Sequence, residues 1–183
     1  YFSAAVQDQV SIERDASGNP VIHASSVADA WFSIGYCQAV DRLPVLELRR
    51  ALALGNTGAV LKGDDAAKMS RLAAVLGIVS DAESAVSKLD PAHRALLDSF
   101  AAGINKGKRR HGSSLLTKES LLRQEWTPRD LVAVALMDSW VHSLLFCKEM
   151  QFAIPEKKMF PALDDFIPHD AVFTYKEKHD ELA

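Results

Sequence analysis

The chain has 183 residues, of which 48% are hydrophobic and 25% charged, a composition typical of a globular protein. Its formal net charge of −3 gives no indication of a nucleic-acid or anionic-membrane partner. No apolar run approaches the roughly 18 residues that a membrane-spanning helix needs. We therefore expect neither a nucleic acid nor a membrane as a partner. The length suits one domain with a sizeable core, or one piece of a larger protein.

The first 25 residues, 1–25, are expected to form a β-hairpin region. Apolar and polar residues alternate over 10–14, turn-forming residues follow, and an apolar stretch resumes at 21–23. Gly18 supplies the positive φ that such a turn often needs. Pro20 favours the start or the edge of a strand, because proline has no N–H for a central ladder.

A helical body is expected to follow over residues 26–154. Ser26 can cap its first helix, with Asp29 at the third helical position as in a capping box. Proline removes one helix hydrogen bond and clashes one turn back, so we expect a kink or restart near Asp41–Pro44. The helix should then continue to about Leu54.

Further helices are expected along this body. The pattern predicts one helix over 65–89, interrupted at Gly77, and another that opens with Asp90 as N-cap and Pro91 at its first position. The basic, glycine-bearing stretch 105–114 is interpreted as a solvated surface loop, and the alternative is a phosphate or nucleic-acid patch.

The last long helix should begin after Trp126, with Thr127 as N-cap. Its sequence LVAVALMDSWVHSLLFCKEM is apolar nearly all round, which predicts burial between two layers. Residues 155–183 are interrupted by prolines and end in a polar tail. The sequence therefore predicts a mostly α chain with a short N-terminal β-hairpin, organised as a single unit over 1–183.

No self-sufficient active site is visible in the sequence. The six histidines include no H-x-x-x-H pair and there is no C-x-x-C, so a zinc site is not expected. The motifs G-x-G-x-x-G, G-x-x-x-x-G-K-[ST] and G-x-S-x-G are absent. Ser139 and Ser143 share one helix with His142, but these positions do not assemble a triad without a partner from elsewhere. We therefore assign no catalytic residue to this chain.

Four ordered segments of the sequence resemble the penicillin acylase family. GYCQAVDRLPVLELRRALALG, which begins at Gly35, is similar to the signature G-Y-x-x-A-x-D-R-L-x-x-x-E-x-x-R-R-x-x-x-G. IERDASGNPVIHASSVADAWFSIGY resembles the family's hairpin and the helix after it, and DPAHRALLDSFAAGIN and EWTPRDLVAVALMDSW resemble two later segments. Four segments in the family's order, over roughly three-quarters of the chain, make the resemblance specific.

The resemblance implies an N-terminal-nucleophile hydrolase made as one secreted precursor. Such a precursor cuts itself into a smaller α chain and a larger β chain, and the new N-terminal residue of the β chain, usually Ser, is the nucleophile. The α-amino group of this nucleophilic residue titrates at roughly pH 7.7–8 and can act as the base. This chain has the size and motifs of an α chain, and Tyr1 cannot be the nucleophile. The resemblance implies a place in an assembled αββα sandwich, a periplasmic or secreted location, and a tail 155–183 near the processing site.

The resemblance also assigns the acyl pocket to the last long helix. Ser139, His142 and Ser143 match pocket positions where phenylacetyl-cleaving members carry Met, Arg and Phe. The two small serines suggest a roomier pocket, which Trp140, Leu144 and Phe146 could refill. The alternative is that His142 is a helix histidine with a purely structural contact.

Glu149 falls where the family places the one α-chain carboxylate of a structural calcium site. Calcium takes six to eight oxygen ligands, so the β chain would have to supply the others. The alternative is an exposed glutamate near a helix end. No cofactor is expected for catalysis.

The helix that starts the family signature carries more charge than a buried helix tolerates without partners. These charged residues are Asp41, Arg42, Glu47, Arg49 and Arg50. We expect them to pair across or beneath an interface with the β chain, where Arg suits bidentate carboxylate contacts. The alternative is a set of surface charges on an amphipathic helix.

The leading hypothesis is the α subunit of a self-processed amidohydrolase that removes the acyl group from a small N-acyl substrate. The β chain of the same precursor would be its obligate partner and would carry the nucleophile. Penicillins, cephalosporins, N-acyl-homoserine lactones and lipopeptides are all open as substrates. The rival hypothesis is a non-enzymatic helical adaptor or binding module, which explains the same absence of catalytic groups.

Overall fold

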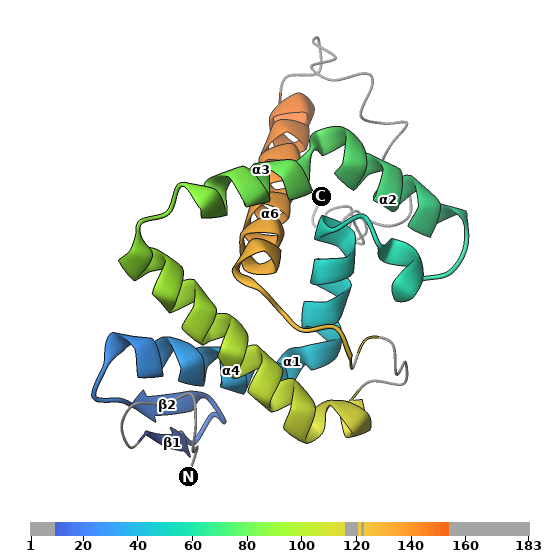
Figure 1. Cartoon of the computed structure of the whole chain (residues 1–183). Coiled ribbons are helices and arrows are strands. Elements are labelled where there is room, and N and C mark those ends of the chain that lie inside the picture. Colours follow the sequence, from blue (N-terminus) through green and yellow to red (C-terminus); the bar gives the residue numbers. More distant parts are fainter. Residues whose placement is uncertain (1–9, 116–120, 122, 154–183) are drawn as a thin grey trace.

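A computed structural model describes residues 10–115, 121 and 123–153 of the chain. The described part is mostly helical, with one two-stranded hairpin at its N-terminal end (Figure 1). Its elements are β1 (Ser11–Arg14), β2 (Pro20–His23), α1 (Val27–Ala53), the short 3₁₀ helix η1 (Thr57–Ala59), α2 (Asp64–Leu76), α3 (Ile78–Ser87), α4 (Pro91–Leu115) and α6 (Pro128–Ala153). The predicted fold class of this chain, mostly α with an N-terminal hairpin, is confirmed.

The hairpin forms for the local reasons that the sequence indicates. β1 and β2 pair antiparallel, with Ser11 opposite His23. In the turn, the Asp15 carboxylate accepts hydrogen bonds from the backbone N–H groups of Ser17 (2.9 Å) and Asn19 (2.7 Å). The side-chain and backbone bonds from Asn19 lower the pKa of Asp15. Gly18 adopts the expected positive φ of 82°.

Helix α1 begins at the predicted cap and bends at the predicted place. The Ser26 Oγ accepts a hydrogen bond from the Asp29 N–H at 3.1 Å and donates one to the Asp29 carboxylate at 2.8 Å. Arg42 has φ −139° and ψ 25°, which are not helical values, two residues before Pro44. The bend therefore lies inside the predicted span, and α1 continues past it to Ala53.

We expect Ser26→Ala to destabilise the start of α1 by about 1 kcal/mol, because an orphan N–H then loses its cap. Hydrogen exchange of the amides in the first turn of α1 measures this change. Ser25→Ala is the matched control, since Ser25 is an exposed neighbouring serine outside the helix. Equal exchange in the two variants would show that the cap contributes nothing.

Helices α1 and α4 cross with their backbones in contact, and small residues make this possible (Figure 1). A Cβ built on Gly103 of α4 would lie 1.9 Å from the carbonyl oxygen of Phe32 on α1. A Cβ on Gly35 of α1 would lie 2.2 Å from the carbonyl oxygen of Phe100. Both glycines therefore have no room for a side chain. Around this crossing one core cluster forms from Ala39, Leu43, Ala101, Ile104 and Trp126.

The stretch 105–114, expected to be a loop, is part of α4 instead. Its glycine at 107 packs against α1, where an added Cβ would lie 2.8 Å from the Ala39 Cβ. The glycine thus serves a close helix contact and not a turn. The correction has a simple cause, because sequence alone does not distinguish these two uses of glycine.

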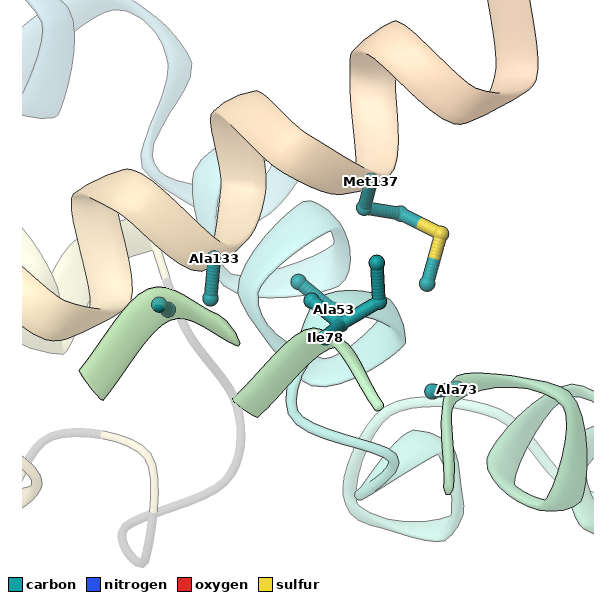
Figure 2. Packing of buried hydrophobic residues seen from close by; sticks show 6 residues of the cluster. Ala53, Ala73, Ile78, Ala133 and Met137 are labelled. Carbon is teal, nitrogen blue, oxygen red and sulfur yellow. The ribbon is translucent and has the colours of Figure 1, made fainter. Parts of the chain in front are cut away.

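A second core cluster joins the end of α1 and helices α2 and α3 to α6 (Figure 2). Its buried members are Ala53, Ala73, Ile78, Ala82, Ala133 and Met137. Four of the six are alanines, so the helices pack closely here. The break between α2 and α3 lies at Gly77, as predicted.

Candidate functional site

Helix α6 starts with two reciprocal hydrogen bonds that fix its first turn. The Thr127 N–H donates to the Asp130 carboxylate at 3.1 Å, and the Asp130 N–H donates to the Thr127 Oγ1 at 3.4 Å. This is a capping box with Asp in the acidic position. The predicted start of α6, with Thr127 as its cap, is confirmed.

Four buried charged side chains connect this helix start to α1 and α4, and we call them the buried ionic cluster. Its members are Glu47 and Arg50 from α1, Lys108 from α4 and Asp130 from α6. The Lys108 Nζ lies 2.7 Å from the Glu47 Oε1, and the Arg50 guanidinium lies 3.1 Å from the Asp130 Oδ2. Two negative and two positive charges balance one another, which is what burial of charge requires.

Further polar contacts hold the segment before α6 on the buried ionic cluster. The Trp126 indole N–H donates to Glu47 at 3.0 Å, and the Arg50 guanidinium lies 5.2 Å from the centre of the Trp126 ring. Lys108 and Arg50 also donate to the carbonyl oxygen of Gln124. Burial lowers the pKa of Lys108, an effect opposed by its hydrogen bond to Glu47. The cluster therefore fixes the position of the start of α6 relative to α1 and α4.

Asn105 adds a second buried clamp on Trp126. Its side-chain amide donates to the Trp126 carbonyl at 2.9 Å, and its amide oxygen accepts from the Trp126 N–H at 2.7 Å. Sequence reasoning missed Asn105 as a partner of Trp126, and it missed Lys108 and Asp130 as partners of α1. The only signal available was the charge on α1 itself, which required partners somewhere in the fold.

The pairing expected across an interface is largely satisfied within this chain. Glu47 and Arg50 pair inside the buried ionic cluster, Asp41 is held by Arg14 at 2.6 Å, and Arg49 pairs with Asp138 at 3.1 Å. These four charges therefore need no second chain, and the expectation is corrected for them. Arg42 is exposed and has no polar partner among the described residues.

One face of α6 is exposed and carries most of the residues assigned to the acyl pocket. Ser139, His142 and Ser143 are exposed, and Phe146 is 61% exposed. Their spacing of three and four residues places them along one side of the helix. Trp140 instead packs, partly buried, against the second core cluster. Among the described residues, α6 is thus covered on one side, whereas its composition predicted burial between two layers.

The polar side chains of this face bond to their own helix. The Ser139 Oγ donates to the Ala135 carbonyl at 2.8 Å and the Ser143 Oγ to the Ser139 carbonyl at 2.9 Å. The His142 Nδ1 donates to the Asp138 carbonyl at 2.7 Å. No pair of nucleophile and base forms among these three residues, so the face can shape a ligand site but cannot itself start acyl transfer.

Glu149 lies exposed further along α6. Within the described residues, no group of three or more His, Cys, Asp or Glu side chains is arranged to hold a metal ion. One carboxylate is far short of the ligand number that calcium requires. The described part of the chain therefore does not provide a calcium site by itself. The described helices also include none that is both long and apolar enough to cross a bilayer.

The arrangement of helices and hairpin matches a solved acylase structure. The thermostable penicillin G acylase from Alcaligenes faecalis is similar with a TM-score of 0.62, and the match covers 91% of this chain and 95% of that chain. Sequence identity is 20%, so this likeness concerns the fold. This chain therefore shares the fold of that acylase chain.

The family is established by sequence. The penicillin amidase family model matches residues 9–168, and the chain belongs to this family. The acyl-homoserine lactone acylase QuiP of Pseudomonas putida is 28% identical over 144 residues, which are 77% of this chain and 18% of that protein. The penicillin acylase 2 proenzyme of Pseudomonas sp. (strain SE83) is 34% identical over 128 residues, which are 68% of this chain and 16% of that protein. The chain thus spans less than a fifth of the length of these curated relatives.

Proposed function

We propose that this chain is the α subunit of a self-processed acylase that hydrolyses the amide bond of a small N-acyl substrate. The observation that carries the proposal is that Ser139, His142, Ser143 and Phe146 lie on one exposed face of α6. The family resemblance assigns Ser139, His142 and Ser143 to the acyl pocket, and Phe146 could help to fill it. Family membership supports the reaction class. The nucleophile and its base would come from a β chain that begins with Ser.

In this proposal the chain binds and orients the acyl group and takes no part in bond making. The exposed ring of Phe146 and the apolar edges of the two serines would contact the acyl chain. Since the His142 Nδ1 donates to its own helix, its Nε2 remains to face the substrate. Attack on the amide carbonyl would come from the β-chain hydroxyl, whose proton passes to the α-amino group of the same residue.

Two details of the proposal rest on the family resemblance. Glu149 would give one carboxylate to a structural calcium ion whose other ligands lie on the β chain. The enzyme would act in the periplasm or outside the cell, where such precursors are secreted.

The test begins with the full-length gene. Purified active material should contain two chains by intact mass, and N-terminal sequencing should show Ser at the start of the larger chain. It should hydrolyse an N-acyl-homoserine lactone, a penicillin or both, the two substrate classes named for the relatives. A single folded chain without acylase activity would instead favour the adaptor hypothesis.

Ser143→Phe should change which acyl group the enzyme accepts. An added ring occupies volume that a long acyl chain would use, and overpacking costs about 1–3 kcal/mol, or roughly a 5- to 150-fold loss in kcat/KM. The measurement is kcat/KM over a series of acyl lengths on matured enzyme, where long chains should lose most. Ser80→Phe, at an exposed serine of α3, is the matched control. A uniform loss across the series would remove Ser143 from the acyl pocket.

A further inference from the structure

The bend in α1 leaves a groove between this helix and the hairpin, which we call the elbow groove. It has a volume of about 390 Å³. Its apolar walls come from β2 and from both halves of the bent helix (Figure 1 shows the hairpin against the first half of α1). These wall residues are Pro20, Ile22, Ile34, Val45 and Leu46.

Apolar side chains around the elbow groove are open to solvent. Ile34 is 39% and Val45 48% exposed. Val27 and Trp31 are also exposed. Trp31 follows Val27 by four residues and Ile34 follows Trp31 by three, which puts all three on one side of α1. A continuous apolar strip therefore leads along α1 into the groove. Such strips with polar edges mark surfaces that another polypeptide covers.

Among the charged side chains that the structure describes around the elbow groove, one cation is unpaired. Asp41 is engaged by two hydrogen bonds from Arg14, of 2.9 and 2.6 Å, and Arg49 is engaged by Asp138. Among the described residues, nothing pairs with the exposed guanidinium of Arg42. A guanidinium presents donors that match the two oxygens of a carboxylate. The groove thus suits a segment with an acidic side chain next to apolar ones.

We infer that the elbow groove docks a segment of the rest of the acylase polypeptide, with an Asp or Glu on Arg42 and apolar side chains between β2 and α1. This inference rests on the proposed function, which supplies the second chain. The matched relatives are much longer than this chain, so most of such a polypeptide is available to cover the groove. A symmetric contact between two copies is disfavoured, because it would place like patches together. Among the described residues that line the groove, the one carboxylate, Asp41, is already paired with Arg14.

The position of the elbow groove also fits a partner that reaches the exposed face of α6. Arg49 lines the groove and pairs with Asp138 of α6, whose carbonyl oxygen accepts the hydrogen bond from His142. The groove therefore ends beside the exposed face of α6. A segment seated in the groove would lie next to the site where the β chain must meet the substrate.

Photocrosslinking on the enzyme made from the full-length gene tests the inference directly. Val45→p-benzoylphenylalanine places a crosslinker at the groove, and Val75→p-benzoylphenylalanine, at a 75% exposed valine of α2, is the matched control. After irradiation, peptides linked to position 45 should come from outside residues 1–183 and contain an acidic residue. Links from position 45 only to this chain or to a second copy, or no links beyond the control, would overturn the inference.

Charge reversal provides an independent readout. Arg42→Glu should lower the amount of assembled two-chain enzyme by about tenfold, because a docked carboxylate would then meet a like charge. Arg71→Glu, at an exposed arginine of α2, makes the same charge change elsewhere and should assemble normally. Equal assembly of the two variants would contradict the role of Arg42. If the wild-type enzyme is an active acylase but position 45 gives no crosslink to the second chain, only the docking inference is wrong. If the wild type has no second chain, the proposed function is wrong.

Discussion

Glu47→Leu should cost about 3–5 kcal/mol, because it leaves the buried cation of Lys108 without its counter-charge. Glu47 also accepts the Trp126 indole N–H, so the segment that leads into α6 loses a contact at the same time. The loss should appear as faster hydrogen exchange in α1, α4 and the first turn of α6. Exchange measured on the assembled enzyme reads local opening without requiring a two-state transition.

Two comparison variants make this prediction specific. Lys108→Met added to Glu47→Leu removes both charges, leaves the Arg50–Asp130 pair of 3.1 Å in place, and should recover much of the lost protection. Glu125→Leu breaks an exposed ion pair with Arg109 of similar length, 2.7 Å, and should cost at most about 1 kcal/mol. If Glu47→Leu and Glu125→Leu behave alike, the buried ionic cluster does not hold α6 in place.

Local chemistry explains which parts of the fold could be predicted from the sequence. The hairpin turn, the caps at Ser26 and Thr127, and the bend before Pro44 each depend on residues within a few positions of one another. Their hydrogen bonds and steric clashes are therefore visible in the sequence. The exposed face of α6 could not be predicted in this way, since the apolar composition of the helix predicted burial and concealed that Ser139 and Phe146 share one open side.

Contacts between distant segments explain what could not be predicted. The charges of α1 clearly required partners, but nothing near them in the sequence indicates that Glu47 pairs with Lys108 and Arg50 with Asp130. These pairs arise only when α4 and the start of α6 pack on α1. Gly107 was misread as a loop residue for the same reason, because it packs against the neighbouring helix α1.

The crossing of α1 and α4 explains why the cost of losing such a glycine should be large. In an exposed helix, Gly→Ala is stabilising by about 1 kcal/mol through backbone entropy. At Gly103 the new Cβ would meet the Phe32 carbonyl oxygen at 1.9 Å and the Tyr36 nitrogen at 2.9 Å. Both are backbone atoms of α1, so no side chain can move aside, and the two helices must separate.

Gly103→Ala should therefore destabilise the crossing by about 3 kcal/mol despite the better helix propensity. Cys37 reports the opening of α1, because its free thiol is buried and burial raises its pKa. We expect a thiol reagent to label Cys37 about a hundredfold faster in the assembled variant, as followed by peptide mass analysis. The reason is that each 1.4 kcal/mol changes the opening equilibrium about tenfold. Gly58→Ala is the control, because its added Cβ would meet nothing within 4 Å. If Cys37 is labelled no faster in Gly103→Ala than in Gly58→Ala, α1 and α4 can accommodate the added methyl group. The close crossing then does not limit the stability of α1.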